Sequence, residues 1–184
     1  MRFVPGVLIA CLFAATALVA APASPPASPV SDALRADLER YEKNIVASAE
    51  TMPADKFRTK PTDKQMSFSD LIRHVTMGDT MMCSWIAGQS APKTPELPAS
   101  SDKNALVDAL KQSFAYCHTA LAGVDDSKLG DEVPFFGGRK VTRAAAILEL
   151  TADWGDHYSL MATELRLAGQ LPPTARRQAT AEGK

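Results

Sequence analysis

Three residues of this sequence have the types and the spacing to bind a metal ion: His74, Asp153 and His157. Asp153 and His157 are four residues apart, so their side chains would lie one turn apart on the same face of a helix. His74 adjoins the apolar stripe of a different predicted helix, and metal sites are commonly built from facing helices. Two imidazoles and one carboxylate leave coordination positions open, as in a reactive site rather than a closed structural one.

Spacing alone also supports a simpler interpretation. An Asp-x-x-x-His pair is frequent by chance, and a hydrogen bond between Asp153 and His157 would satisfy both side chains. A lone histidine such as His74 on an apolar face is more often a satisfied core residue than a ligand. The third histidine, His118, is expected to point outward or toward a helix edge.

Four amphipathic helices are predicted to position these residues, because apolar residues recur at steps of three and four. Ser31 is expected to cap the first helix, and Ser67 with Asp70 to form a capping box at the second. The fourth helix begins behind Thr142, and Gly169 takes the left-handed position that ends it. The predicted helices span residues 32–49, 68–87, 103–122 and 143–168.

Such helices need mutual burial, so the predicted fold is all-α, a four-helix bundle over residues 32–173. No segment alternates long enough for a convincing strand, although Pro134–Phe136 fits a short extended piece or a turn. The residues at 174–184 form a polar tail that is expected to fray. At least one connection is expected to cross over, since residues 50–66, 88–101 and 124–141 exceed the usual bundle loops. The expected inward positions of the last helix are Ala146, Leu150, Asp153, His157, Leu160 and Glu164.

Two stretches of the sequence resemble a known family. Residues 66–75 (MSFSDLIRHV) look like the second-helix motif of the DinB-like superfamily. Residues 153–173 begin with DWGDHYSL and end with LRLAGQLPP. They look like the last helix of that superfamily and the segment that follows it. The resemblance spans about residues 32–173 and implies a four-helix bundle with a metal site.

The resemblance also implies a ligand set. In the family one ligand comes from the second helix and two from a His-x-x-x-His pair on the fourth. By position, His74 matches the first ligand and His157 the third, while Asp153 stands where the second histidine usually lies. A carboxylate is a harder ligand and lowers the charge of the site by one. The implied cofactor is a divalent metal, with zinc, nickel, iron and manganese all left open.

Relatives in this superfamily include metal-dependent enzymes that use low-molecular-weight thiols, and others have no established activity. The resemblance therefore implies a metal-dependent hydrolase or transferase of a small molecule, because a metal with open positions activates bound water or thiol. The alternative is a non-catalytic envelope bundle that binds a ligand or a partner, with Asp153 and His157 as a structural pair. Relatives frequently pair through helix faces, so a homodimer is also implied.

The N-terminus has the pattern of a secretory signal peptide at residues 1–23. Arg2 precedes the apolar run Val7–Ala21, which small residues follow up to a cleavage site after Ala23, with Ala20 and Ala21 as the alternative sites. That run is shorter than a membrane span needs, so no stable anchor is expected in the mature protein. A lipoprotein box ending at Cys11 fits less well, because the apolar run continues past it. We expect a periplasmic or secreted protein with a proline-rich spacer at residues 24–31.

Composition excludes two other classes of protein. Among 184 residues, 46% are apolar, which is too many for a disordered chain. The 20 basic and 21 acidic residues nearly balance, so nucleic acid is not an expected partner. After export, Cys83 and Cys117 are the only pair of cysteines, and three roles stay open: a structural disulfide, two buried apolar fillers, or a redox-active dithiol.

Overall fold

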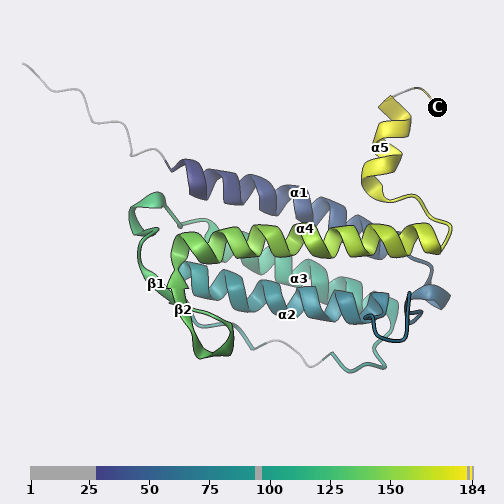
Figure 1. Ribbon diagram of the computed structural model, residues 1–184, viewed down its shortest axis with the longest axis horizontal. Helices are drawn as coiled ribbons and strands as arrows, with labels where there is room; N and C mark the ends of the chain where they lie inside the picture. The colour runs from purple at the N-terminus through teal and green to yellow at the C-terminus, as the bar shows by residue number, and fades with distance from the viewer. Residues whose placement is uncertain (1–27, 94–96, 182, 184) are drawn as a thin grey trace, which may run out of the picture.

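The computed structural model describes residues 28–93, 97–181 and 183, and these residues are mostly helical (Figure 1). The four long helices are α1 (Pro29–Thr51), α2 (Phe68–Ala87), α3 (Lys103–Leu121) and α4 (Arg143–Leu167). The short elements are the 3-10 turns η1 (Ala54–Lys56), η2 (Asp126–Lys128) and η3 (Phe136–Gly138), the strands β1 (Glu132–Pro134) and β2 (Lys140–Thr142), and helix α5 (Pro173–Ala181). The expected signal peptide lies outside the described residues.

Each long helix packs against two of the others (Figure 1). Helix α1 contacts α3 and α4, and helix α2 contacts α3 and α4. Lys103 at the start of α3 donates to the main-chain oxygen of Met52, just after α1. Arg143 at the start of α4 donates to the main-chain oxygen of Ile86 near the end of α2. Helices α1 and α3 are therefore antiparallel, and so are α2 and α4.

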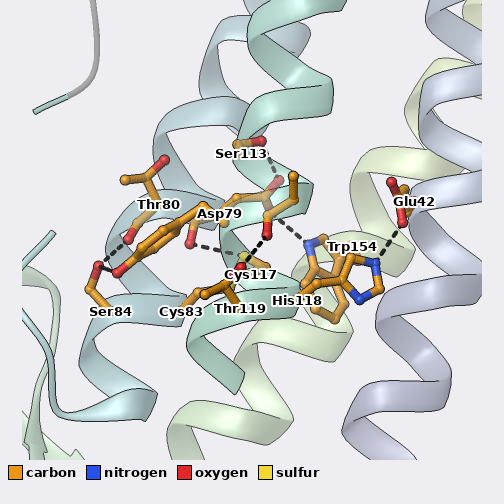
Figure 2. Close-up of a disulfide and its surroundings, with 12 residues drawn as sticks. Glu42, Asp79, Thr80, Cys83, Ser84, Ser113, Cys117, His118, Thr119 and Trp154 are labelled. Carbon is orange, nitrogen blue, oxygen red and sulfur yellow. Dashed lines mark hydrogen bonds and ion pairs between the residues drawn. A yellow bond between two sulfur atoms is a disulfide. The ribbon is translucent and has the colours of Figure 1, made fainter. Parts of the chain in front are cut away.

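A disulfide between Cys83 and Cys117 joins α2 to α3 (Figure 2). Both residues are fully buried, so of the three roles that the sequence leaves open, the structure has the structural disulfide. The two cysteines lie near the C-terminal ends of their helices, so α2 and α3 run in the same direction. The connection at 88–102 must then return along roughly 30 Å of helix, which confirms that one connection crosses over.

The core is centred on Trp154 of α4, which is fully buried. Its ring contacts Tyr41 of α1 and Phe114 of α3, with ring centroids 6.1 and 6.2 Å apart. Aromatic side chains contribute large buried areas, so the ring of Trp154 joins α4 to both α1 and α3. None of the helices in the described residues has the length and continuous apolarity that a membrane span needs.

Local signals at three helix ends are confirmed. Ser67 accepts from the main-chain N–H of Asp70, and the Asp70 side chain accepts from that of Ser67, so the capping box is complete. Thr142 accepts from the main-chain N–H of Ala145 at the start of α4. Gly169 has φ of 73°, the left-handed backbone expected just after α4.

The start of α1 differs from the prediction. The helix begins at Pro29, so the end of the expected spacer is helical, and Ser31 is buried within the first turn instead of capping it. The cap comes from the distant Asp126, whose carboxylate accepts from the main-chain N–H groups of Val30 and Ser31 at 3.0 and 2.9 Å. Burial opposes ionisation of Asp126, but these hydrogen bonds outweigh it and lower its pKa.

A short pair of strands and a C-terminal helix were not predicted from the sequence. Strands β1 and β2 pair in antiparallel register, with Val133 opposite Val141. Three residues each are too few to show an alternating pattern, although the extended piece expected near Pro134 overlaps β1. The C-terminal segment forms helix α5 where a frayed tail was expected. The Tyr158 hydroxyl lies 2.7 Å from Thr174 Oγ1 and so ties the start of α5 to α4.

Candidate metal centre

His74, Asp153 and His157 come together between α2 and α4. Their ligand atoms all lie within 4.8 Å of one another. The two imidazole rings have centroids 4.8 Å apart and are tilted by 36°. Bonds of about 2.0–2.2 Å to one ion place ligand atoms roughly 3–3.5 Å apart. Small side-chain rotations therefore suffice for these three residues to hold one cation.

The ring of His157 is oriented as in a metal ligand. Its Nδ1 lies 2.7 Å from the main-chain oxygen of Asp153. Because a carbonyl oxygen only accepts hydrogen bonds, Nδ1 carries the proton, and Nε2 of the neutral ring presents its lone pair. Histidine ligands almost always donate their second ring N–H to such an acceptor. The local structure of α4 thus prepares His157 to bind through Nε2.

The charge at the centre comes from Asp153. Its Oδ2 lies 3.3 Å from His157 Nδ1. Burial of His157 opposes its protonation, but the hydrogen bond and the negative charge of Asp153 outweigh burial and raise the pKa of the imidazole. Protons and a metal compete for such a ring. Protonation of the imidazole therefore closes the ring to a metal, and the neutral ring above its pKa is available as a ligand.

The centre lies at the edge of the core rather than inside it, which corrects part of the expected inward stripe of α4: four of its six positions are buried, namely Ala146, Leu150, His157 and Glu164, but Asp153 and Leu160 are not. His157 is only 7% exposed, but the Asp153 side chain is 36% exposed and Leu160 is 41% exposed. Trp154 and Met161 take the fully buried positions instead. The reason is that α4 packs against both α1 and α2, so its buried arc is centred on Trp154. The ligand positions lie on the rim of that arc, where the Asp153 side chain is partly exposed to solvent.

Gly78 leaves space beside the carboxylate. It follows His74 by one turn of α2, and a Cβ placed on it would lie 3.9 Å from Asp153 Oδ2. That separation is an ordinary van der Waals contact.

The other histidine does not belong to the centre. His118 is on α3, and its Nε2 lies 2.7 Å from the Glu42 carboxylate at the surface (Figure 2). This confirms the expectation that His118 points outward. It also provides a matched histidine for control experiments.

Comparison with known families identifies the family to which the chain belongs. The sequence profile of the DinB superfamily matches residues 37–161. The chain belongs to the DinB superfamily. The recognition from two sequence stretches is therefore confirmed. A search of curated proteins found no match.

Solved structures share the DinB-like fold. A DinB-like protein from Bacillus subtilis is 18% identical, covers 76% of this chain and 96% of its own, and has a TM-score of 0.61. A DinB-like protein from Bacillus cereus is 13% identical, covers 77% of this chain and 95% of its own, and has a TM-score of 0.63. A mycothiol-dependent maleylpyruvate isomerase is 15% identical and covers 70% of this chain and 59% of its own, with a TM-score of 0.57. At these identities the likeness shows the fold alone.

One buried acid of this DinB-like chain was missed by the sequence analysis. Asp79 of α2 is 2% exposed and accepts hydrogen bonds from Trp154 Nε1 at 2.7 Å and Ser113 Oγ at 2.9 Å (Figure 2). Burial raises its pKa to about 7, although both hydrogen bonds oppose the rise. Its position four residues after Val75 and four before Cys83, both in the core, was the signal available in the sequence.

Proposed function

We propose that this DinB-like protein is an exported four-helix bundle that binds one divalent cation through His74, Asp153 and His157. The bound ion serves a metal-dependent hydrolase or transferase reaction on a small molecule. One observation carries the proposal: ligand atoms from two distant stretches of the chain lie within 4.8 Å of one another. The orientation of His157, with Nδ1 committed to a main-chain oxygen, supports it.

The donor set fits a catalytic ion. Three protein ligands with one carboxylate leave positions for water or substrate, and zinc, nickel, iron and manganese all accept nitrogen and oxygen ligands. When bound, such an ion supplies a Lewis acid that lowers the pKa of water or thiol and polarises a carbonyl. Asp153 contributes the negative charge, and the exposed rim of α4 admits the small molecule.

Two features support export to the periplasm or beyond. The first is the N-terminal sequence, with its apolar run at 7–21. The second is the buried disulfide of Cys83 and Cys117, because such bonds persist in oxidising compartments. Low-molecular-weight thiols are scarce there, so we favour water over a thiol as the group that the metal activates. N-terminal sequencing of protein from its own envelope should begin near Ser24, and a retained Met1 would contradict export.

A non-catalytic ligand-binding or partner-binding bundle is the second candidate. The observation that favours it is the contact of 3.3 Å between Asp153 Oδ2 and His157 Nδ1, which pairs the two side chains without a metal. On this hypothesis an Asp153→Asn/His157→Gln variant changes stability alone. Added divalent metal then leaves the melting temperature of the unaltered protein unchanged.

The deciding experiment measures metal content and metal-linked stability. Protein purified from its own envelope without chelator is analysed for metals, beside a His74→Ala/His157→Ala variant and the control His118→Ala. We expect metal in the unaltered protein and the control but not in the double variant. At a hundredfold excess over Kd, added metal should stabilise the fold by about 2.7 kcal/mol, or roughly 5–10 °C. Equal metal content in all three proteins would remove the proposed centre.

A further inference from the structure

A cavity of about 310 Å³ opens where α1 and α4 end and the α1–α2 connection begins. This end cavity is apolar over much of its wall, and its volume is at the lower end of the range for small-molecule sites. Its apolar lining comes from Met52, Pro61, Leu167 and Ala168.

Glu164 of α4 lines the end cavity and is only 8% exposed. Within the described part of the chain, no hydrogen bond or ion pair satisfies its carboxyl group. Burial raises the pKa of Glu164 to about 7, and the negative charge of the nearby Asp70 adds to the rise. The carboxyl oxygens of Glu164 are not among the fully enclosed unpaired atoms of the described residues, so they reach the cavity that Glu164 lines. A cation from outside the chain can therefore pair with this largely buried acid.

Basic side chains line another part of the end cavity. Lys56 and Lys60 come from the α1–α2 connection, and both are exposed. Lys56 has the exposed Asp55 as its ion-pair partner at 3.5 Å. The cavity therefore presents a buried acid, an apolar wall and solvated ammonium groups within one small volume.

We propose that the end cavity binds a small zwitterion with an apolar body, of the ω-amino acid class. The ammonium group of the ligand pairs with Glu164, its methylene chain packs against the apolar wall, and its carboxylate lies near Lys60. Glu164 follows His157 by seven residues, so it lies roughly 10 Å farther along nearly the same face of α4. The proposal stands independently of the metal centre.

Titration calorimetry on the full chain tests this site with three probes of one length: 6-aminohexanoate, hexylamine and hexanoate. We expect 6-aminohexanoate to bind best and hexanoate at least tenfold more weakly, because hexanoate lacks the ammonium group. Glu164→Gln should weaken 6-aminohexanoate at least tenfold. Glu149→Gln, which changes an exposed glutamate of the same helix, should leave the affinity unchanged.

Two further measurements keep the test decisive if Glu164→Gln folds poorly. Ala168→Phe should fill the cavity and abolish binding while Glu164 is retained. In the unaltered protein, the carboxyl carbon-13 resonance of Glu164 at pH 6 should move to its ionised position when 6-aminohexanoate is added. Absence of binding, equal binding of hexanoate, or an unmoved resonance would overturn the proposal. The His74→Ala/His157→Ala variant should bind the probe normally, so loss of the metal centre and failure of the end cavity give different results.

Discussion

Replacement of Asp79 by Asn should remove most of the pH dependence of stability that this buried acid produces. Asp79 lies in the core at 2% exposure and accepts from Trp154 Nε1 and Ser113 Oγ. An Asn side chain has nearly the same shape, and its amide oxygen can accept from the indole N–H as the carboxylate does. Asp79→Asn should therefore fold while removing the titrating group.

The magnitude follows from the difference in pKa between the two states. Asp79 has a pKa of about 7 in the fold, and an unperturbed aspartate has about 3.9. Between these two pKa values Asp79 keeps its proton in the native state but not in the unfolded state. The stability that this proton contributes is therefore complete below the unfolded pKa and is lost as pH rises through about 7. The slope approaches about 1.4 kcal/mol per pH unit. Between pH 5 and 8 the free energy of unfolding should fall by about 2–3 kcal/mol.

Urea unfolding at pH 5, 6, 7 and 8 measures this fall in the unaltered protein, in Asp79→Asn and in the control Asp108→Asn. Asp108 is an exposed residue of α3, so its variant should keep the full slope. His157 also has a raised pKa, so its contribution to stability is lost in the same direction as pH rises. The unaltered protein and Asp79→Asn both contain His157 and share this loss. The difference in slope between the unaltered protein and Asp79→Asn therefore isolates Asp79. Equal slopes in these two proteins would refute the reasoning.

Three further predictions concern other parts of the fold. Replacement of Cys83 and Cys117 together by alanine should lower the free energy of unfolding by about 2–4 kcal/mol, as measured by urea unfolding under oxidising conditions. Asp126→Ala should lower the melting temperature by circular dichroism, because α1 loses its cap. Because the pKa of Asp126 is lowered in the fold, its carboxylate stabilises the fold at pH values above its unfolded pKa. The difference in melting temperature between the two proteins should therefore vanish as pH falls through the folded pKa. Gly78→Ala should raise the stability of metal-free protein by about 0.5–1 kcal/mol, and a fall would show that the space beside Asp153 is smaller than the structure indicates.

The elements that local signals specify were predictable from the sequence. The four long helices lie where the apolar repeats placed them, and the capping box at Ser67 and the Thr142 cap are present as predicted. These features depend on residues three or four apart, which a single sequence displays directly. The meeting of His74 with Asp153 and His157 was predictable because each residue adjoined an apolar stripe.

The features that the sequence did not reveal depend on residues far apart in the chain. The cap of α1 comes from Asp126, about 95 residues beyond Ser31, so Ser31 was the nearer but wrong candidate. Asp79 is buried because Trp154 and Ser113 of other helices cover it. Four of the six expected inward positions of α4 are buried, but Asp153 and Leu160 lie at the edge of the core. Trp154 and Met161 are fully buried instead, because two neighbouring helices, rather than one, determine which arc of α4 is buried.

The tie between Asp126 and the first turn of α1 has a consequence for synthesis. Val30 and Ser31 are among the first described residues to leave the ribosome. The carboxylate that accepts from their main-chain N–H groups belongs to Asp126, which is synthesised much later. Contacts of such long sequence separation form late, because the intervening chain must be closed into a loop first. Nascent chains arrested before residue 126 should therefore have a frayed helix start that proteases attack, and chains arrested well beyond it should resist cleavage there.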